Sequence, residues 1–385
     1  MHFKLTAALS LALLLAGCDT VGRFQTPGTP GATVGQPTGE VIGTGAIRVA
    51  LLVPQSAGGN GAGVANVFKN AARLGLKDFP NADIRLLVKD TAGTAEGAAA
   101  ATQQALSEGA ELVLGPVFSH SVSAAAGVAR PAGVPIIGFS SDVGAASRGA
   151  YLLSFLPQDD VRRIVGYAAD NGRTAMAAMF PDTNYGAVVE AAFRQEAARR
   201  SIRIISIQKY SPTPEDIGAK AKEIGQFANR VDSIFFPGDP QAAVFISQTL
   251  VANGVDPGQV KFLGSGQWDN QAVQREPNLL GAWYPAPART DFDSFAGRYQ
   301  AEFGTRPPRN ATLAYDAVRL AAGLVREAGP RRFSTGAITS PDGFLGVDGI
   351  FRFRTNGTNE RGLAVYEVGS GSARIVAPAR RSFGS

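Results

Sequence analysis

The chain has 385 residues, of which 45% are hydrophobic, so it is long enough to form two or three domains with sizeable cores. Its formal net charge of +5 comes from scattered lysines and arginines, without a basic run interleaved with aromatic residues, which argues against nucleic acid as a partner. The single cysteine excludes a disulfide bond within the chain.

The first residues predict export and attachment to a membrane. Lys4 precedes an apolar run over residues 5–15, which is too short to span a bilayer comfortably. The string LAGC that ends at Cys18 is similar to the lipobox of bacterial lipoproteins. This resemblance implies that residues 1–17 are a signal peptide and that Cys18 becomes the lipidated first residue, which anchors the protein to a membrane.

The segment that follows predicts a flexible tether. Residues 18–45 are rich in Gly, Pro, Thr and Gln and contain few large apolar side chains. Asp19 directly follows the lipidated cysteine, and in enterobacterial lipoproteins an aspartate there favours retention in the inner membrane. We therefore expect a periplasmic protein, with the inner membrane as the favoured site of its anchor.

The remaining chain alternates short apolar runs with segments of helical periodicity, which predicts the α/β class. In a first series, strands are expected at 46–53, 84–88, 112–114 and 135–139, and helices at 63–79, 95–107 and 119–130. An extended segment at 152–155 and a helix at 157–171 lead to a second series, with strands at 175–180, 202–210, 233–236 and 260–263 and helices at 185–200, 214–229 and 240–253. The chain closes with a connection at 283–287, helices at 291–303 and 312–328, strands at 349–353 and 364–368, and a polar tail. Two such series imply two lobes with a cleft between them.

Two hydroxyl-rich loops follow neighbouring strands of the first series. One contains Ser119, His120 and Ser121, and the other contains Ser140, Ser141 and Asp142. Ligands of parallel sheets bind outside the carboxyl ends of the strands, so both loops are expected to meet at one binding site. The alternative is structural, since Ser119 and either Ser141 or Asp142 could simply cap the helices that follow.

Catalysis is the function that the sequence supports least. His120 is the only histidine beyond residue 18, and a histidine next to two serines in sequence is not a nucleophile with its base. One histidine and no free cysteine also exclude the usual zinc ligand sets. The Gly-rich loop at 54–61 lacks both the Lys-Ser/Thr pair of a P-loop and a dinucleotide fingerprint. We therefore expect neither an enzyme, nor a metal, nor a cofactor.

Several strings resemble the type I periplasmic binding proteins, in particular the Leu/Ile/Val-binding branch. They are RVALLVPQSAGG near the start, ELVLGPVFSHSVSAAAGVA, PIIGFSS, and the late GFLGVDGIFRFRTNG. The resemblance implies a two-lobed fold in which each lobe is a mainly parallel sheet with helices on both faces, and in which the chain crosses between lobes at three hinges. It places the first lobe at 47–155 plus 283–328, the second lobe at 156–282 plus 329–368, and a flexible tail at 369–385.

The same resemblance assigns ligand-binding residues. Ser119 and Ser121 match a loop that binds an amino-acid carboxylate, with His120 beside them, and Ser140, Ser141 and Asp142 match the second loop of the first lobe. The second lobe is implied to contribute Tyr185, Asp239 and Gln267. Receptors of this branch usually place an acid near Gly266, where this chain has Gln267 and Asp269. Asp239 also precedes Pro240, which is typical of a helix N-cap.

Two functions follow from the resemblance. The first is a lipid-anchored receptor that captures a small polar solute, such as an amino acid, and delivers it to an ABC transporter permease. The second rests on the string FLPQDD at 155–160, which resembles lipoprotein activators of penicillin-binding proteins. These activators use the same fold to contact a protein partner in peptidoglycan synthesis.

Overall fold

The computed structural model describes residues 35–384. The predicted signal peptide, Cys18 and the part of the predicted tether before residue 35 lie outside the described residues. Within residues 35–384, no helix combines the length and the apolar character that crossing a membrane requires.

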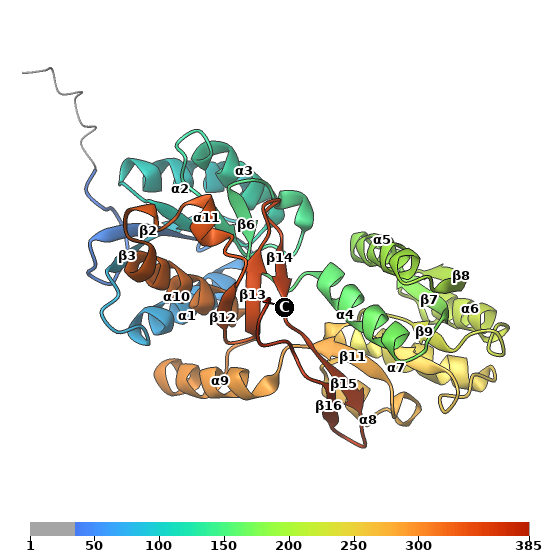
Figure 1. Ribbon diagram of the computed structural model, residues 1–385. Coiled ribbons are helices and arrows are strands. Elements are labelled where there is room, and N and C mark those ends of the chain that lie inside the picture. The colour runs from blue at the N-terminus through green and yellow to red at the C-terminus, as the bar shows by residue number, and fades with distance from the viewer. Residues whose placement is uncertain (1–34, 385) are drawn as a thin grey trace, which may run out of the picture. The chain divides into compact units, whose positions relative to one another are not determined.

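The first sheet has the strand order β1-β3-β2-β4-β5-β6, and all its pairings are parallel except that of β1 (Figure 1). The central strands are continuous apolar runs because helices cover both faces of the sheet. Val49 and Leu51 pack with residues of α1 and α10, whereas Ala50 and Leu52 pack with α2 and α3. The elements in chain order are β1 (Val41–Ile42), β2 (Ile47–Val53), α1 (Gly61–Lys77), β3 (Ile84–Asp90), α2 (Ala95–Ser107), β4 (Leu112–Leu114), α3 (Ser119–Ala129), β5 (Ile136–Gly138), the 3-10 turn η1 (Val143–Ala145) and β6 (Ala150–Leu152).

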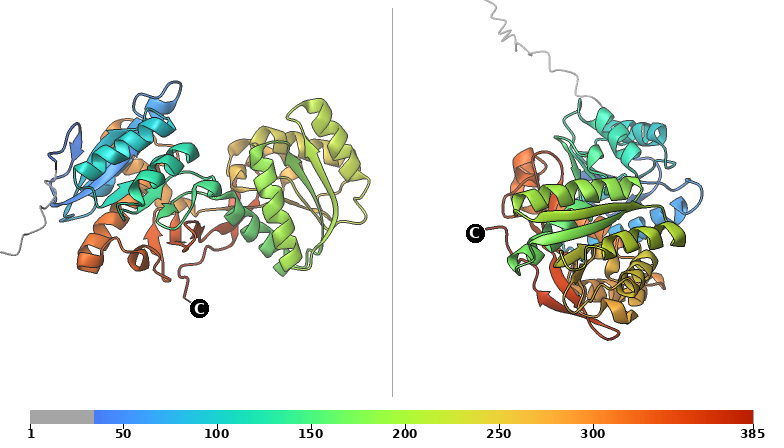
Figure 2. Two further views of the ribbon diagram at one scale, coloured as in Figure 1. Left: turned by 90° about the horizontal axis from the view of Figure 1, so that it is seen from above. Right: turned by 90° about the vertical axis from the view of Figure 1, so that its right-hand side faces the viewer.

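The second sheet has the order β16-β15-β11-β10-β9-β7-β8, in which the five strands from β11 to β8 are parallel. Figure 2 shows helices on both of its faces. Met176 and Ala178 pack with α4 and α5, and Ala177 and Met179 pack with α6 and α7, so successive residues of β7 serve opposite faces. The elements are α4 (Pro157–Asp170), β7 (Ala175–Pro181), α5 (Asn184–Arg199), β8 (Arg203–Tyr210), α6 (Pro214–Gly225), β9 (Ser233–Phe235), α7 (Pro240–Ala252), β10 (Lys261–Leu263), η2 (Gly266–Trp268), α8 (Gln271–Arg275), η3 (Pro277–Leu279), β11 (Trp283–Ala286), β15 (Ala364–Val368) and β16 (Ala373–Ala377).

The chain passes between the two sheets three times, which agrees with the predicted two-lobed fold. The first passage is between β6 and α4, the second follows β11, and the third lies between β14 and β15. After the second passage α9 and α10 pack against α1, and a small antiparallel sheet of β12, β13 and β14 adds Phe351 and Phe353 to the core of the first lobe. These elements are α9 (Arg289–Phe303), α10 (Ala311–Ala328), η4 (Gly329–Arg331), α11 (Thr335–Ile338), β12 (Phe344–Gly346), β13 (Gly349–Phe353) and β14 (Asn359–Arg361).

Two segments lie in a different lobe from the one expected. Residues 283–286 were expected to belong to the first lobe, but they form β11, which pairs with β10 and β15 of the second sheet. Residues 329–353 were expected in the second lobe, but Phe333, Ile338 and Phe351 are part of the first lobe's core. The chain therefore crosses after Ala286 and again before β15. The apolar side chains of residues 283–286 pack in the core of the second lobe, and those of residues 329–353 pack in the core of the first lobe.

Two terminal segments are ordered by pairing where flexibility was expected. The predicted tether extended to residue 45, but β1 pairs with β3 and the Gly35 amide donates to the carbonyl of Ser107 at 3.0 Å. The predicted flexible tail includes β16, which pairs antiparallel with β15. In both cases a glycine-containing sequence covers the open edge of a sheet, where backbone hydrogen bonds provide the attachment and Ile42, Val376 and Ala377 pack against the adjoining cores.

Candidate functional site

A cavity of about 330 Å³ lies where all three passages between the sheets come together. Phe155 to Asp160 comes from the first passage, Pro287 from the second, and Arg361 and Leu363 from the third. The remaining lining comes from loops at strand ends and from the start of α10. The full lining is Ser141, Phe155, Leu156, Pro157, Asp159, Asp160, Tyr185, Gly266, Gln267, Pro287, Arg309, Asn310, Arg361 and Leu363. The volume falls within the range of about 300–1,000 Å³ that is typical of small-molecule sites.

Asp160 is one of two acidic groups that line this cavity, and its neighbour Asp159 pairs with Arg162 at 2.7 Å. Pro157 occupies the first turn of α4 and Asp160 follows in the same turn, where a carboxylate interacts favourably with the helix dipole. Its Oδ2 atom accepts a hydrogen bond from the Gly266 amide at 2.8 Å. Desolvation raises the pKa of Asp160 to about 7, the neighbouring charge of Asp159 acts in the same direction, and the Gly266 hydrogen bond opposes it. A small change of surroundings at neutral pH therefore decides whether this group is charged.

Arg361 is one of two arginines that line the cavity, with Arg309, and its hydrogen bonding is incomplete. The side chain is buried, its Nε atom donates to the carbonyl of Ser154 at 2.9 Å, and its guanidinium lies 4.7 Å from the centre of the Phe155 ring. Both Nη atoms are buried, and neither has a hydrogen-bond partner among the described residues. A buried cationic donor without a partner costs free energy, and a ligand oxygen that reached it would remove that cost.

Arg309 and Asn310 complete the first-lobe side of the cavity. Arg309 donates through Nη1 to Oδ1 of Asp348 at 2.8 Å, so its charge is paired within the first lobe. Asn310 immediately precedes α10, makes no side-chain capping hydrogen bond there, and is exposed. The side-chain amide of Asn310 therefore makes no hydrogen bond to the start of α10, and it can donate to or accept from a solute.

Three of the residues expected to bind a ligand line this cavity. Ser141 comes from the loop after β5, Tyr185 from the first turn of α5, and Gln267 from η2. Burial raises the pKa of the Tyr185 hydroxyl well above its ordinary value, so this group is a neutral donor at physiological pH. The cavity therefore joins one predicted loop of the first lobe with two predicted positions of the second.

The other predicted residues make contacts within the protein. The Ser121 hydroxyl donates to the carbonyl of Thr94 at 3.1 Å, and the His120 ring lies 2.9 Å from the carbonyl of Gly93 and stacks on Phe118. Ser119 begins α3 but is not its N-cap, because Phe118 holds that position without a side-chain hydrogen bond. None of these three residues lines the cavity, and their role toward a ligand stays a prediction.

The remaining predicted residues also make contacts within the protein, and two of them, Asp142 and Asp239, are helix N-caps. Asp142 accepts from the Gly144 amide at 2.9 Å at the start of η1, and Ser140 accepts from the amide of Asp142 at 3.1 Å. Asp239 accepts from the Gln241 and Ala242 amides and so caps α7. Asp239 was expected both as a ligand contact and as an N-cap, and its carboxylate serves the cap.

Sequence reasoning did not identify Asp160 or Arg361 as site residues. The string FLPQDD enters the sequence analysis only through its resemblance to activators of penicillin-binding proteins, and the position of its acids at the end of an extended segment was the signal that could have indicated a site. Arg361 lies in a short strand that the sequence did not predict. No group of three or more metal-ligating side chains occurs in the described part of the chain.

Comparisons with known proteins give one family. Residues 46–373 match the family model described as periplasmic binding protein. An uncharacterized protein of Rickettsia prowazekii (strain Madrid E) is 20% identical over 218 residues, which are 54% of this chain and only 58% of that protein.

Solved structures share the fold at low sequence identity. A putative branched-chain amino acid ABC transporter from Rhodospirillum rubrum is similar with a TM-score of 0.76 and 21% identity, over 86% of this chain and 100% of that chain. A leucine binding protein from Thermotoga maritima MSB8 is similar with a TM-score of 0.60 and 18% identity, over 87% of this chain and 99% of that chain. A solute binding protein of an ABC transporter from Rhodopseudomonas palustris BisB5, in complex with 3,4-dihydroxy benzoic acid, is similar with a TM-score of 0.60 and 19% identity. The match covers 87% of this chain and 96% of that chain.

Proposed function

Because this chain belongs to the periplasmic binding protein family, we propose that it is a solute receptor that captures a small zwitterionic solute, of the amino-acid class, in the cavity between its lobes. The single observation that supports this most strongly is the pairing of opposite charges in one cavity. Arg361 offers two buried Nη atoms that have no hydrogen-bond partner within residues 35–384, and Asp160 offers a carboxyl group. A solute with a carboxylate and an ammonium group would satisfy both.

The energetics favour a charged solute over a neutral one. A hydrogen bond to a charged group contributes about 1.5–3 kcal/mol, compared with about 1 kcal/mol for a neutral pair. An ammonium group next to Asp160 would stabilise the ionised carboxylate and lower its pKa from the value near 7. Tyr185 and Gln267, both of the second lobe, would then add neutral hydrogen bonds that fix the orientation of the solute.

The position of the cavity supports capture by closure. Its walls combine the three passages between the sheets with residues of both lobes, so a change in the angle between the lobes would alter its shape. A solute that contacts residues of both lobes stabilises the closed form by its differential affinity for that form. Delivery to an ABC transporter permease, and lipid attachment through Cys18 to the periplasmic face of the inner membrane, belong to this proposal.

The alternative, an activator of a penicillin-binding protein, would need a surface for a protein partner. The exposed large apolar side chains of the described residues are Val41, Leu280, Leu345 and Ile375, and they lie in four different segments. We therefore place the receptor first. Co-purification of a penicillin-binding protein, together with failure of every solute to bind, would reverse the order.

A thermal-shift screen tests the proposal. The purified protein is heated with each of the twenty amino acids and, for each hit, with the analogues that lack either the amino or the carboxyl group. A ligand at 100 times its dissociation constant stabilises the folded state by about 2.7 kcal/mol. We expect at least one amino acid to raise the melting temperature and both of its analogues to have a much smaller effect. Equal shifts with the analogues would exclude recognition of a zwitterion.

A further inference from the structure

A second, larger cavity of about 690 Å³ lies in the first lobe, away from the passages between the lobes. It is formed by the end of α3 and the loop that leads into β5, by the turn before β6, and by the start of α11. These loops precede β5 and β6, whereas the predicted solute loops follow the ends of β4 and β5. Because the strands are parallel, this cavity lies at the amino ends of β5 and β6, and the loop that carries Ser141 lies at the opposite, carboxyl end of β5.

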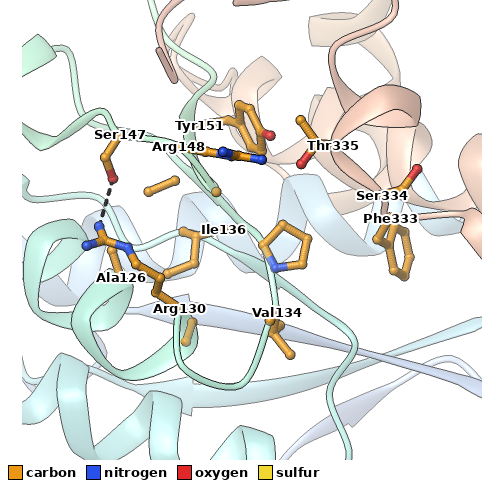
Figure 3. A pocket seen from close by; sticks show the side chains of 15 residues that line it. Ala126, Arg130, Val134, Ile136, Ser147, Arg148, Tyr151, Phe333, Ser334 and Thr335 are labelled. Atoms are coloured by element: carbon orange, nitrogen blue, oxygen red, sulfur yellow. Dashed lines mark hydrogen bonds between the residues drawn. The ribbon is translucent and has the colours of Figure 1, made fainter. Parts of the chain in front are cut away.

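The charged residues that line this second cavity are both basic. Arg130 donates through Nη2 to the hydroxyl of Ser147 at 3.0 Å, and Arg148 makes no ion pair or side-chain hydrogen bond with the described residues (Figure 3). Of the residues that the structure describes, none with a carboxylate side chain lines the cavity. The rest of the wall is largely apolar, with Ala126, Ala129, Val134, Pro135, Ile136 and Phe333.

Tyr151 adds a buried polar group without a partner. The side chain is 1% exposed and its ring packs on Phe353, with 5.5 Å between the ring centres. Its hydroxyl makes no hydrogen bond within the described structure. Figure 3 shows this hydroxyl pointing toward the side of the cavity where Arg148 and Thr335 lie. A buried hydroxyl is normally paired, so this one indicates a missing partner.

The geometry points to a second binding site, in which Arg148 and the Tyr151 hydroxyl hold the carboxylate of a small molecule whose apolar body packs against Ile136, Val134 and Phe333. A guanidinium donates two parallel hydrogen bonds to a carboxylate, and a phenol donates one, so these donors match the acceptor-only character of that group. The apolar wall favours an organic acid over inorganic phosphate, which has no apolar surface to bury. This site is independent of the solute cavity between the lobes.

Calorimetric titration of the purified full chain with hexanoate, hexanamide and inorganic phosphate tests the site. Hexanoate and hexanamide have nearly the same shape and differ in charge. We expect hexanoate to bind saturably at millimolar concentration, and hexanamide and phosphate to bind at least about tenfold more weakly. Equal binding of hexanoate and hexanamide, or no binding of hexanoate, would overturn the proposal.

Variants assign the binding to this cavity. Arg148→Gln should weaken hexanoate binding by about 10- to 100-fold, whereas Arg203→Gln, at an exposed arginine of β8, should leave it unchanged. Tyr151→Phe removes only the unpartnered hydroxyl, so it should weaken binding without lowering the melting temperature. Asp160→Asn, in the solute cavity, should not affect hexanoate binding. Unchanged affinity in both Arg148→Gln and Tyr151→Phe would show that hexanoate binds elsewhere and would refute the site.

Discussion

The carboxylate of Asp160 accepts a hydrogen bond from the backbone amide of Gly266, with 2.8 Å between Oδ2 and N. This contact joins the first turn of α4, which starts at the first passage between the sheets, to the loop after β10 that carries Gln267. One acidic side chain thus helps to shape the solute cavity and also lines it. Its protonation is coupled to both the stability of the fold and the charge of the site.

Stability should depend on pH through Asp160. The pKa of Asp160 is about 7 in the folded protein and has its ordinary value of 3.8 in the unfolded chain. Between these two pH values the folded protein therefore binds more protons than the unfolded chain. The stabilisation from the protonated form is complete below the unfolded-state pKa and is lost as the pH rises through the folded-state pKa. Asp160→Asn, which stays neutral, should therefore raise the melting temperature at about pH 8 and change it little at about pH 4. A variant that melts lower than the parent protein at the higher pH would contradict the raised pKa.

Gly266 should not tolerate a side chain. A Cβ atom there would lie 3.0 Å from Oδ2 of Asp160 and 3.3 Å from the carbonyl of Pro285. Gly266→Ala should displace the loop, lower the free energy of unfolding by about 1–3 kcal/mol and weaken solute binding. The matched control is Gly218→Ala in α6, where a Cβ atom meets nothing within 4 Å. That change should be neutral or stabilising by up to about 1 kcal/mol in denaturant unfolding. Equal behaviour of the two variants would refute the steric argument.

Ser121 and Ser141 should separate stability from binding. Ser121 is buried and bonded to the carbonyl of Thr94, so Ser121→Ala should destabilise the fold by about 1 kcal/mol and leave solute affinity unchanged. Ser141 is exposed and lines the cavity, so Ser141→Ala should weaken affinity with unchanged melting. Affinity and melting temperature are measured for both variants. Weaker affinity in Ser121→Ala with unchanged affinity in Ser141→Ala would support the carboxylate-binding role that the family resemblance implies for the loop at the start of α3.

Cys18 should be the point of membrane attachment. Cys18→Ala removes the thiol that the lipobox resemblance marks for acylation, so the protein should remain unprocessed or appear in the soluble periplasmic fraction. Membrane fractionation with mass measurement of the N-terminus distinguishes these outcomes from that of the parent protein. A mature, membrane-bound variant would show that the anchor lies elsewhere.

Long apolar strands and capped helices could be predicted from the sequence. The helix at 95–107 and the strands at 112–114 and 349–353 have the predicted bounds, because apolar periodicity and turn residues define them locally. β1, β14 and β16 could not be predicted in this way. They are edge strands held by backbone pairing: β14 is the polar string NER, and β1 and β16 lie in segments whose overall Gly-rich composition is typical of flexible chain.

The site was predictable only in part. Ser141, Tyr185 and Gln267 follow closely after β5, β7 and β10, so the carboxyl ends of parallel strands bring them toward the same cavity. Arg361 reaches that cavity from a strand more than 200 residues after Phe155 in the sequence, and only the third passage between the sheets brings the two together. Hydroxyl groups such as that of Ser121 can turn either toward a ligand or toward a backbone carbonyl, and sequence patterns do not distinguish the two.

Calorimetric titration of the best amino acid from the thermal-shift screen tests the central claim most directly, that the cavity between the lobes recognises a zwitterion through Asp160. The parent protein, Asp160→Asn and Asp291→Asn are compared at about pH 8, where Asp160 is ionised. Asp291 is an exposed acid in the first turn of α9. Its replacement controls for the general effect of removing a negative charge from a helix N-terminus. We expect Asp160→Asn to weaken binding by about 10- to 100-fold and Asp291→Asn to leave it unchanged. The same dissociation constant in all three proteins would contradict the account.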